Sequence, residues 1–232
     1  MAARQLPLFE YQPKPQYEPV DYIKQGAQAF AAQRGRSVSH EGLVDLQVDS
    51  PRAFATARQY AAAPAFDSRA LPAFDAMRAS TREQYEHLTK TQGVKVEVTQ
   101  DDPYPNVQAM AEDLRTNKRN KVLSTEQTGG HPYFTNEEND QFRAVHDAYG
   151  HAALGRGFTR HGEEAAYRAH AQMYPPEARP ALEMETRGQN SYLNYGPTGD
   201  FGEQKVATLQ PLEQSKKAAA PKAVQQQFPG MR

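Results

Sequence analysis

Histidine is the residue type whose spacing indicates chemistry in this chain. Five of the seven histidines fall between residues 131 and 170, at His131, His146, His151, His161 and His170. Imidazole is the commonest metal ligand and carries protons near neutral pH, so such a cluster predicts a metal site or acid–base catalysis. The chain contains no cysteine, which excludes thiolate zinc sites, iron–sulfur clusters, disulfides and a cysteine nucleophile. Any metal must therefore be held by nitrogen and oxygen atoms.

The helix expected to carry the first two ligands starts at Thr135. Thr135 with Glu138 three residues later fits a capping box, and an apolar stripe follows at helical spacing, formed by Phe142, Val145 and Tyr149. His146 and His151 lie five residues apart, which separates them by about 140° on an ideal α-helix. Their side chains are long enough to converge on one ion, and Gly150 removes a side chain that would crowd it. We expect both histidines to be ligands.

The third ligand must come from a carboxylate on another helix. The segment after Pro175-Pro176 predicts a helix in which Glu185 shares a face with apolar residues. On a different face, Glu183 and Arg187 form an i,i+4 pair that predicts a surface salt bridge. A buried carboxylate needs a partner, which for Glu185 is either a metal or a nearby Arg or His.

The sequence thus predicts a metal site formed by His146, His151 and Glu185, with Fe(II) or Zn(II) as the metal. Two neutral imidazoles and one carboxylate with open positions form the facial triad of non-haem Fe(II) enzymes and also suit catalytic zinc. The residues expected to orient the ligands or move protons are Asp147, Glu163, Glu164 and His170. The alternative is that the histidines are hydrogen-bonded structural groups. We interpret His131 as a loop residue rather than a further ligand, and His161 as solvent-facing.

One local segment resembles a known family of metalloenzymes. His146-Asp147-Ala148-Tyr149-Gly150-His151 is similar to the His-Glu-x-x-Gly-His segment of the aromatic amino acid hydroxylases, and Phe201-Gly202-Glu203 is similar to a segment further along that family. The resemblance implies that His146 and His151 bind Fe(II), with Glu185 completing the triad. It does not extend to the pterin or the aromatic substrate.

A broader resemblance is to a set of phage-encoded proteins without a settled activity. It is carried by Phe142-Arg143-Ala144-Val145-His146-Asp147, by Gly162-Glu163-Glu164 and by Glu185-Thr186-Arg187-Gly188-Gln189-Asn190-Ser191. It implies a phage or prophage origin, a compact domain with flexible ends, and the host cytoplasm or the virion as location.

Three functions follow as expectations. The first is a metal-dependent enzyme, with Fe(II) oxidation of the oxygenase or hydroxylase type as the leading chemistry. The second is a metal phosphohydrolase using His146-Asp147 as its dyad, which would need His131 and Asp200 as further ligands. The third is a virion-associated structural or interaction protein without catalysis, assembled with the virion or with copies of itself through its terminal arms.

Composition limits the partners. The formal net charge is −1, so no basic field attracts nucleic acid. The mean hydropathy is −0.85, and no apolar run reaches the roughly 18 residues of a membrane span. The start of the chain does not fit a signal peptide. No glycine-rich phosphate loop is present, so no nucleotide cofactor is expected. A small molecule of unknown identity remains the expected substrate.

The chain is expected to form one globular domain over residues 20–212, between a Pro/Tyr-rich extended arm (1–19) and a low-complexity tail (213–232). The fold class is mainly α, an α+β chain with a minor two-stranded element, in which helices surround a His/Glu cavity. Val94–Val98 alternates strictly and predicts one strand; the second is expected over Lys121–Thr125.

Overall fold

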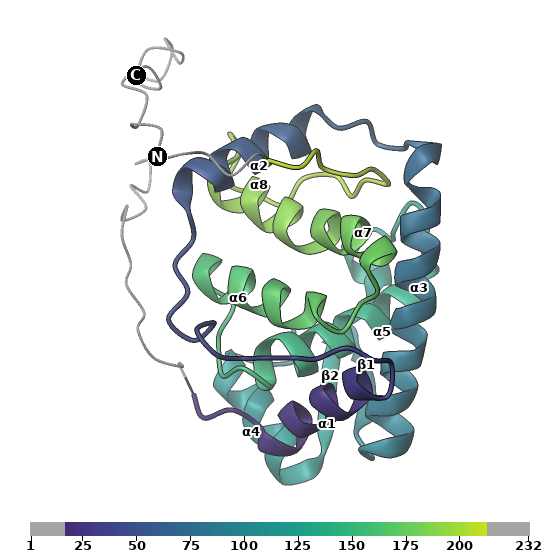
Figure 1. Ribbon diagram of the computed structural model, residues 1–232, viewed down its shortest axis with the longest axis vertical. Helices are drawn as coiled ribbons and strands as arrows, with labels where there is room; N and C mark the ends of the chain where they lie inside the picture. Colours follow the sequence, from purple (N-terminus) through teal and green to yellow (C-terminus); the bar gives the residue numbers. More distant parts are fainter. Residues whose placement is uncertain (1–16, 213–232) are drawn as a thin grey trace.

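The computed structural model describes residues 17–212 and is mainly helical. Its α-helices are α1 (Asp21–Ala32), α2 (Ser50–Ala62), α3 (Leu71–Glu86), α4 (Val107–Asn117), α5 (Asn136–His146), α6 (Arg160–Ala171), α7 (Arg179–Glu183) and α8 (Gln189–Tyr195). Figure 1 shows α6 in the middle of the molecule, α7 and α8 on one side of it, α1 on the other, and α3 along one edge. The predicted arm and tail lie largely outside the described residues.

The expected two-stranded element is present. β1 (Lys95–Thr99) pairs in parallel with β2 (Arg119–Leu123), with Lys95 opposite Arg119. Parallel strands need a crossover connection, and α4 supplies it. The second strand begins two residues earlier than the sequence predicts. The mainly helical fold class with a small sheet is confirmed.

The helix starts follow the local chemistry of the sequence. Asp49 caps α2 by accepting a hydrogen bond from the backbone N–H of Arg52 (3.2 Å). The capping box before α5 is present in full: Thr135 accepts from the Glu138 N–H at 3.2 Å, and the Glu138 carboxylate accepts from the Thr135 N–H at 3.0 Å. These caps satisfy N–H groups that a helix leaves unpaired, so the boundaries needed for the site are fixed locally.

Three turns of π-helix interrupt the longer helices. They are η2 (His87–Thr91) after α3, η4 (Asp147–Ala152) after α5, and η6 (Met184–Gly188) between α7 and α8. In such a turn the backbone bonds residues five apart instead of four; in η4 the N–H of Ala153 donates to the carbonyl of Ala148 (2.9 Å). π-turns occur often at functional sites, and η4 contains the second predicted ligand.

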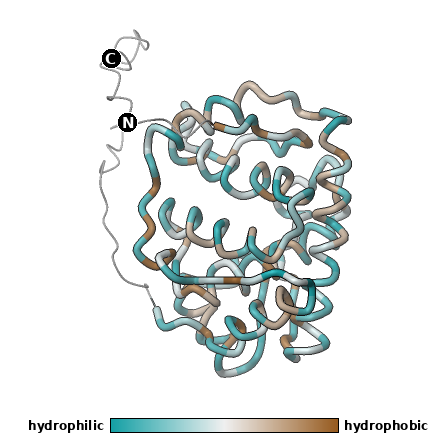
Figure 2. Tube along the Cα trace, in the orientation of Figure 1, coloured by the Kyte–Doolittle hydropathy of each residue, from teal (hydrophilic) through white to brown (hydrophobic). Residues whose placement is uncertain are grey.

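Two apolar clusters meet around α5 and α6. The first joins α1, α4 and η4, and the second joins α2, α3, α5, α6 and the helix from α7 to α8. Figure 2 shows hydrophobic and hydrophilic residues alternating along the helices, the pattern of helices that bury one face. No helix among the described residues is long and apolar enough to cross a membrane.

Candidate metal centre

The π-turn η4 brings His146 and His151 onto one face. On a regular α-helix, residues five apart point about 140° away from each other. Because the π-turn closes its hydrogen bonds over five residues, this spacing spans one turn, and the two side chains project together. Their ring centroids lie 5.1 Å apart with the ring planes at 88°. The sequence-based expectation that the two imidazoles converge is met through a local backbone change.

Glu163, in the first turn of α6, supplies the carboxylate. One of its oxygens lies 3.7 Å from Nε2 of His146 and 3.5 Å from Nε2 of His151. The ligand atoms offered by the three residues all lie within 4.8 Å of one another. Ligands about 2.0–2.2 Å from a metal are about 3.0–3.5 Å apart. The two nitrogen–oxygen distances exceed that range by a few tenths of an ångström at most.

In the neutral form of His151, Nε2 carries no proton. Its Nδ1–H donates to the carbonyl oxygen of Arg156 at 3.0 Å, and a carbonyl can only accept. Nε2 of the neutral ring therefore presents its lone pair to Glu163. Metal-binding histidines commonly donate their other N–H to a carbonyl or carboxylate in this way.

A chain of two hydrogen bonds gives His146 the same orientation. His170 places Nε2 at 2.8 Å from Oε1 of Gln84 and Nδ1 at 3.3 Å from Nδ1 of His146. The Gln84 oxygen only accepts, so Nε2 of His170 carries the proton and its Nδ1 accepts. The Nδ1–H of His146 is the donor of the second bond. Nε2 of His146 is then also free to bind a metal.

The pKa shifts describe an ionised Glu163 that is paired with the histidines beside it. Burial acts to raise the pKa of Glu163, but His151 and His146 outweigh it and hold that pKa far below the usual range. Burial acts to lower the pKa of His151, and the Glu163 carboxylate overcomes this and raises it. Burial, helped by His146 and His151, lowers the pKa of His170 well below 6.5 and keeps it neutral. Without a metal, a proton on an imidazole has to neutralise Glu163.

Asp147 adds a second carboxyl group to the environment of the centre. Burial raises its pKa to about 6, against the lowering effects of His151 and His146. A carboxyl group with such a pKa changes protonation state close to neutral pH, which suits proton transfer. The sequence-based role of Asp147 therefore remains a prediction with support from its position.

Two glycines let the helices approach closely enough. A Cβ on Gly150 would lie 3.2 Å from Cβ and 3.3 Å from the carbonyl oxygen of Ala166 on α6. A Cβ on Gly162 would lie 1.8 Å from the carbonyl oxygen of Gly157. The contact at Gly162 is too short for any side chain, and the contacts at Gly150 are tight enough that a side chain there would push Ala166 by a few tenths of an ångström. The packing that brings Glu163 to the histidines therefore uses both glycines.

The centre is deep but not sealed. The side chains of His146, His151 and Glu163 are 12%, 1% and 25% exposed, so solvent reaches the site on the Glu163 side. The half-exposed ring of Phe158 stands edge-on to His151 with centroids 4.8 Å apart. Phe158 was not predicted from the sequence, where a single Phe after a glycine gives no signal.

The structure places Glu185 away from this group. Glu185 is buried, as its apolar neighbours in the sequence predict, but its partner is His131, at 3.2 Å. Its second oxygen accepts from Gln189 at 2.9 Å, while Nδ1 of His131 accepts the backbone N–H groups of Tyr133 and Phe134. The carboxylate that joins the histidines is Glu163, expected only as a surrounding residue. The ring nitrogens of His131 and the carboxylate oxygens of Glu185 already have hydrogen-bond partners within the protein.

The other predicted residues divide by helix face. Glu164 does not join the centre, because consecutive helical residues point about 100° apart; it pairs with Arg168 and Arg187, at 2.8 and 2.6 Å. The predicted pair of Arg187 with Glu183 is present, but the Arg187 side chain is only 10% exposed, so the pair is not the surface salt bridge that the sequence predicts. His161 is buried, where the sequence predicted exposure, and its Nδ1 accepts from the Val48 N–H at 3.1 Å.

Gln84 was missed in the sequence. It is fully buried on α3, in the helical row that also contains Met77, Thr81 and Leu88. The available signal was this uncharged polar residue on an apolar face, since a buried amide needs partners. Its partners are His170 and Ser80, whose Oγ lies 3.2 Å from Nε2 of Gln84.

Comparison of the chain with models of protein families, with curated proteins and with solved structures finds no match. The resemblances to the hydroxylases and to phage-encoded proteins therefore remain predictions. The geometry of His146, His151 and Glu163 is what function has to be inferred from.

Proposed function

We propose that this chain is a metal-dependent enzyme with a single-metal centre held by His146, His151 and Glu163. The observation that supports this most is the convergence of three ligand atoms within 4.8 Å of one another, with both imidazoles oriented by bonds to Arg156 and His170. Three lone-pair donors facing one point repel one another unless a cation lies between them. A metal ion supplies that charge without the proton.

The donor set favours Fe(II), with Zn(II) second. Two imidazoles and one carboxylate with open positions form the ligand set of non-haem Fe(II) oxygenases, and the same three ligands with one water suit catalytic zinc. We propose oxidation of a small molecule of the oxygenase or hydroxylase type. A metal held by His146, His151 and Glu163 would supply the activation of O2 or water, and Asp147 would take or give a proton beside the centre.

The opening of the centre favours a substrate with an apolar part. Phe158 is half exposed next to His151, so it provides an apolar wall where solvent reaches the ligands. A substrate that covers this exposed aromatic ring removes apolar surface from water, which is favourable. The substrate itself is otherwise open.

The phosphohydrolase alternative receives no support from the geometry. His131, which it requires as a ligand, is bonded to Glu185, and Asp200 is exposed and outside the metal-binding group. The virion or self-assembly alternative rests on arms that lie largely outside the described residues, and on the phage resemblance. It stays a proposal about location and partners that can coexist with catalysis.

The experiment that tests the proposed function asks whether a bound Fe(II) has open positions. The protein is loaded with Fe(II) without oxygen and treated with nitric oxide, which binds open positions of Fe(II) and gives a characteristic electron paramagnetic resonance signal. We expect the signal in the parent and in Glu185→Gln, and its loss in Glu163→Gln. Bound Fe(II) that does not react with nitric oxide would indicate a closed, structural site and overturn the proposal.

A further inference from the structure

A polar pocket lies on the face of α6 that carries Glu164. It encloses a cavity of only about 30 Å³, which widens into solvent at its mouth, and it is lined from α2, α6 and the helix from η6 to α8. Four of its lining residues are arginines, namely Arg52, Arg160, Arg168 and Arg187, and two are acidic, namely Asp49 and Glu164. None of the three metal-centre residues lines it.

Two of the arginines are already neutralised. Glu164 accepts from Arg168 and from both Nε and Nη2 of Arg187, at 2.6–2.8 Å. Arg187 also bonds Glu183 and lies 4.1 Å from the ring centre of Tyr167. These two guanidinium groups are held in place by carboxylates. They form the rigid wall of the pocket rather than its open binding groups.

Arg52 is different. Among the described residues it has no carboxylate partner, and its Nε is buried without a hydrogen-bond partner. The hydroxyl oxygen of Tyr195, in the same lining, is also buried and unpartnered within the described part of the chain. Buried donors almost always have an acceptor. The unpartnered Nε of Arg52 indicates an acceptor that binds from outside the chain.

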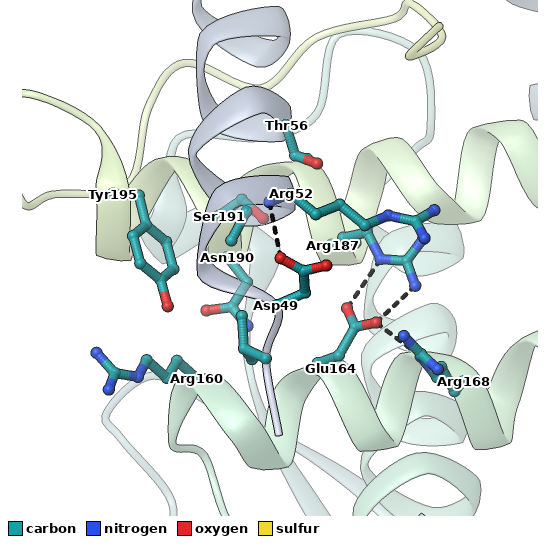
Figure 3. A pocket seen from close by; sticks show the side chains of 12 residues that line it. Asp49, Arg52, Thr56, Arg160, Glu164, Arg168, Arg187, Asn190, Ser191 and Tyr195 are labelled. Atoms are coloured by element: carbon teal, nitrogen blue, oxygen red, sulfur yellow. Dashed lines mark hydrogen bonds and ion pairs between the residues drawn. The ribbon is translucent and has the colours of Figure 1, made fainter. Parts of the chain in front are cut away.

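Figure 3 shows how these groups are arranged. Arg52 and Arg187 lie toward one end, Arg160 and Tyr195 toward the other, and Asp49 in between. The Asp49 carboxylate caps α2 and would repel an anion near the centre. The end where Arg52 and Arg187 meet, beside Tyr167, is therefore the place for a negative charge, since both act on the pKa of Tyr167.

We infer that this pocket binds the phosphate group of a small molecule, with Arg52 as its principal ligand. A phosphate offers only acceptors and carries close to two negative charges at neutral pH, which suits Arg52, a guanidinium that no carboxylate among the described residues neutralises. The planar guanidinium fork binds phosphate oxygens in pairs. A carboxylate would supply half of that charge.

The test uses isothermal titration of the full chain with inorganic phosphate, in metal-free protein and in Glu163→Gln, so that phosphate cannot bind through the metal. We expect saturable binding in both, weakened about tenfold or more in Arg52→Gln, as for loss of a charge-assisted bond. Arg52→Lys, which keeps the charge and loses the fork, is expected to fall in between. Arg58→Gln, an exposed arginine of the same helix, should bind as the parent does.

Several outcomes would overturn the inference. They are equal heat with chloride at the same ionic strength, equal or tighter binding of acetate, and unchanged phosphate binding in both Arg52 variants. Tighter binding of a single-stranded oligonucleotide that is lost in Arg52→Gln would assign the pocket to nucleic acid instead. A Glu163→Gln variant that loses metal binding and keeps phosphate binding would show that the phosphate pocket does not depend on the metal centre.

Discussion

At the scale of single residues, the decisive feature of the centre is which imidazole nitrogen carries the proton. His151 and His146 both turn Nε2 toward Glu163, because Arg156 and His170 occupy the opposite ring edges. Partners of this kind typically change metal affinity by one to two orders of magnitude. The residues behind the ligands should therefore matter almost as much as the ligands.

This leads to a prediction for His170. In His170→Phe, the Nδ1–H of His146 loses its acceptor, and we expect metal affinity to fall about 10–100-fold while the protein stays folded. Competition with a metal-sensitive dye measures the affinity. Thr81→Val is the matched control, because it removes a buried hydrogen bond to Tyr174 from the same layer outside the chain of bonds. Equal affinities in parent and His170→Phe would contradict the role of His170.

A second residue-scale prediction concerns His40 and acid stability. Burial lowers the pKa of His40 to about 4, with a smaller effect of Lys24, and neither ring nitrogen has a partner within the described residues. The unfolded chain binds this proton near pH 6.5, so stability is lost as pH falls from about 7 towards 4. Between pH 7.5 and 4.5 the loss assigned to His40 is about 2–3 kcal/mol.

Urea unfolding of metal-free protein at the two pH values measures this loss of unfolding free energy. In His40→Gln the loss between the two pH values should be smaller by about 2–3 kcal/mol. The difference between parent and variant removes the contributions of other groups. Parallel pH dependence in the two proteins would show that His40 is protonated or partnered in the folded state.

At the scale of elements, the centre depends on the π-turn η4 and on the close packing of η4 against α6. The sequence predicted the helix, its capping box and the participation of His146 and His151, since these depend on local spacing. It could not predict the π-turn, which arises from tertiary packing. It assigned the carboxylate ligand to Glu185 and gave Glu163 a surrounding role, whereas Glu163 is the carboxylate that lies beside the histidines. Only the packing of α6 against α5 and η4 decides which carboxylate reaches them.

A partial signal for Glu163 was present. Glu163 and His170 lie seven residues apart on one face of α6, and both contact His146. The sequence predicts that Glu163 and His170 share a face of this helix. Which neighbouring helix this face contacts depends on the connection at residues 153–159. The partner of Glu185, His131, is in a loop that no periodicity describes.

Gly150→Ala tests the close packing. The added methyl group would meet the Ala166 carbonyl at 3.3 Å and Cε1 of His146 at 3.4 Å, so α6 has to move. We expect a stability loss of about 1–3 kcal/mol and weaker metal binding, measured by urea unfolding and by dye competition. Adding Ala166→Gly removes the contact with the Ala166 Cβ and should restore part of the stability and part of the metal affinity. A variant with the parent's affinity would show that the helices have room to spare.

At the scale of the whole molecule, a metal would join α5 with η4 to α6 and so connect the two apolar clusters. A ligand that binds only the folded state stabilises it by about 2.7 kcal/mol at 100 times its dissociation constant. We expect Fe(II) or Zn(II) to raise the melting temperature of the parent, with reversal by a chelator, and to leave Glu163→Gln unchanged. An equal rise in Glu163→Gln would place the metal elsewhere.

The mainly helical architecture was predictable because its helices have strong caps and periodic apolar faces. The arginine pocket was not, since it is assembled from α2, α6 and α8, which are far apart in the chain. The sequence could not predict that Glu163 faces the histidines while Glu164 faces the arginine pocket, because this depends on how the neighbouring helices pack against α6. This packing places two chemically different groups of side chains on one helix.

The most direct test of the central claim is the metal content of four proteins. The parent, His151→Gln, Glu163→Gln and Glu185→Gln are purified without a metal-binding tag, loaded separately with Fe(II) and Zn(II), and measured by elemental analysis after removal of free metal, with circular dichroism to confirm folding. We predict close to one metal per chain in the parent and in Glu185→Gln, and loss of metal in folded His151→Gln and Glu163→Gln. Metal lost in Glu185→Gln and kept in Glu163→Gln, or no metal in the parent, would contradict the proposed centre.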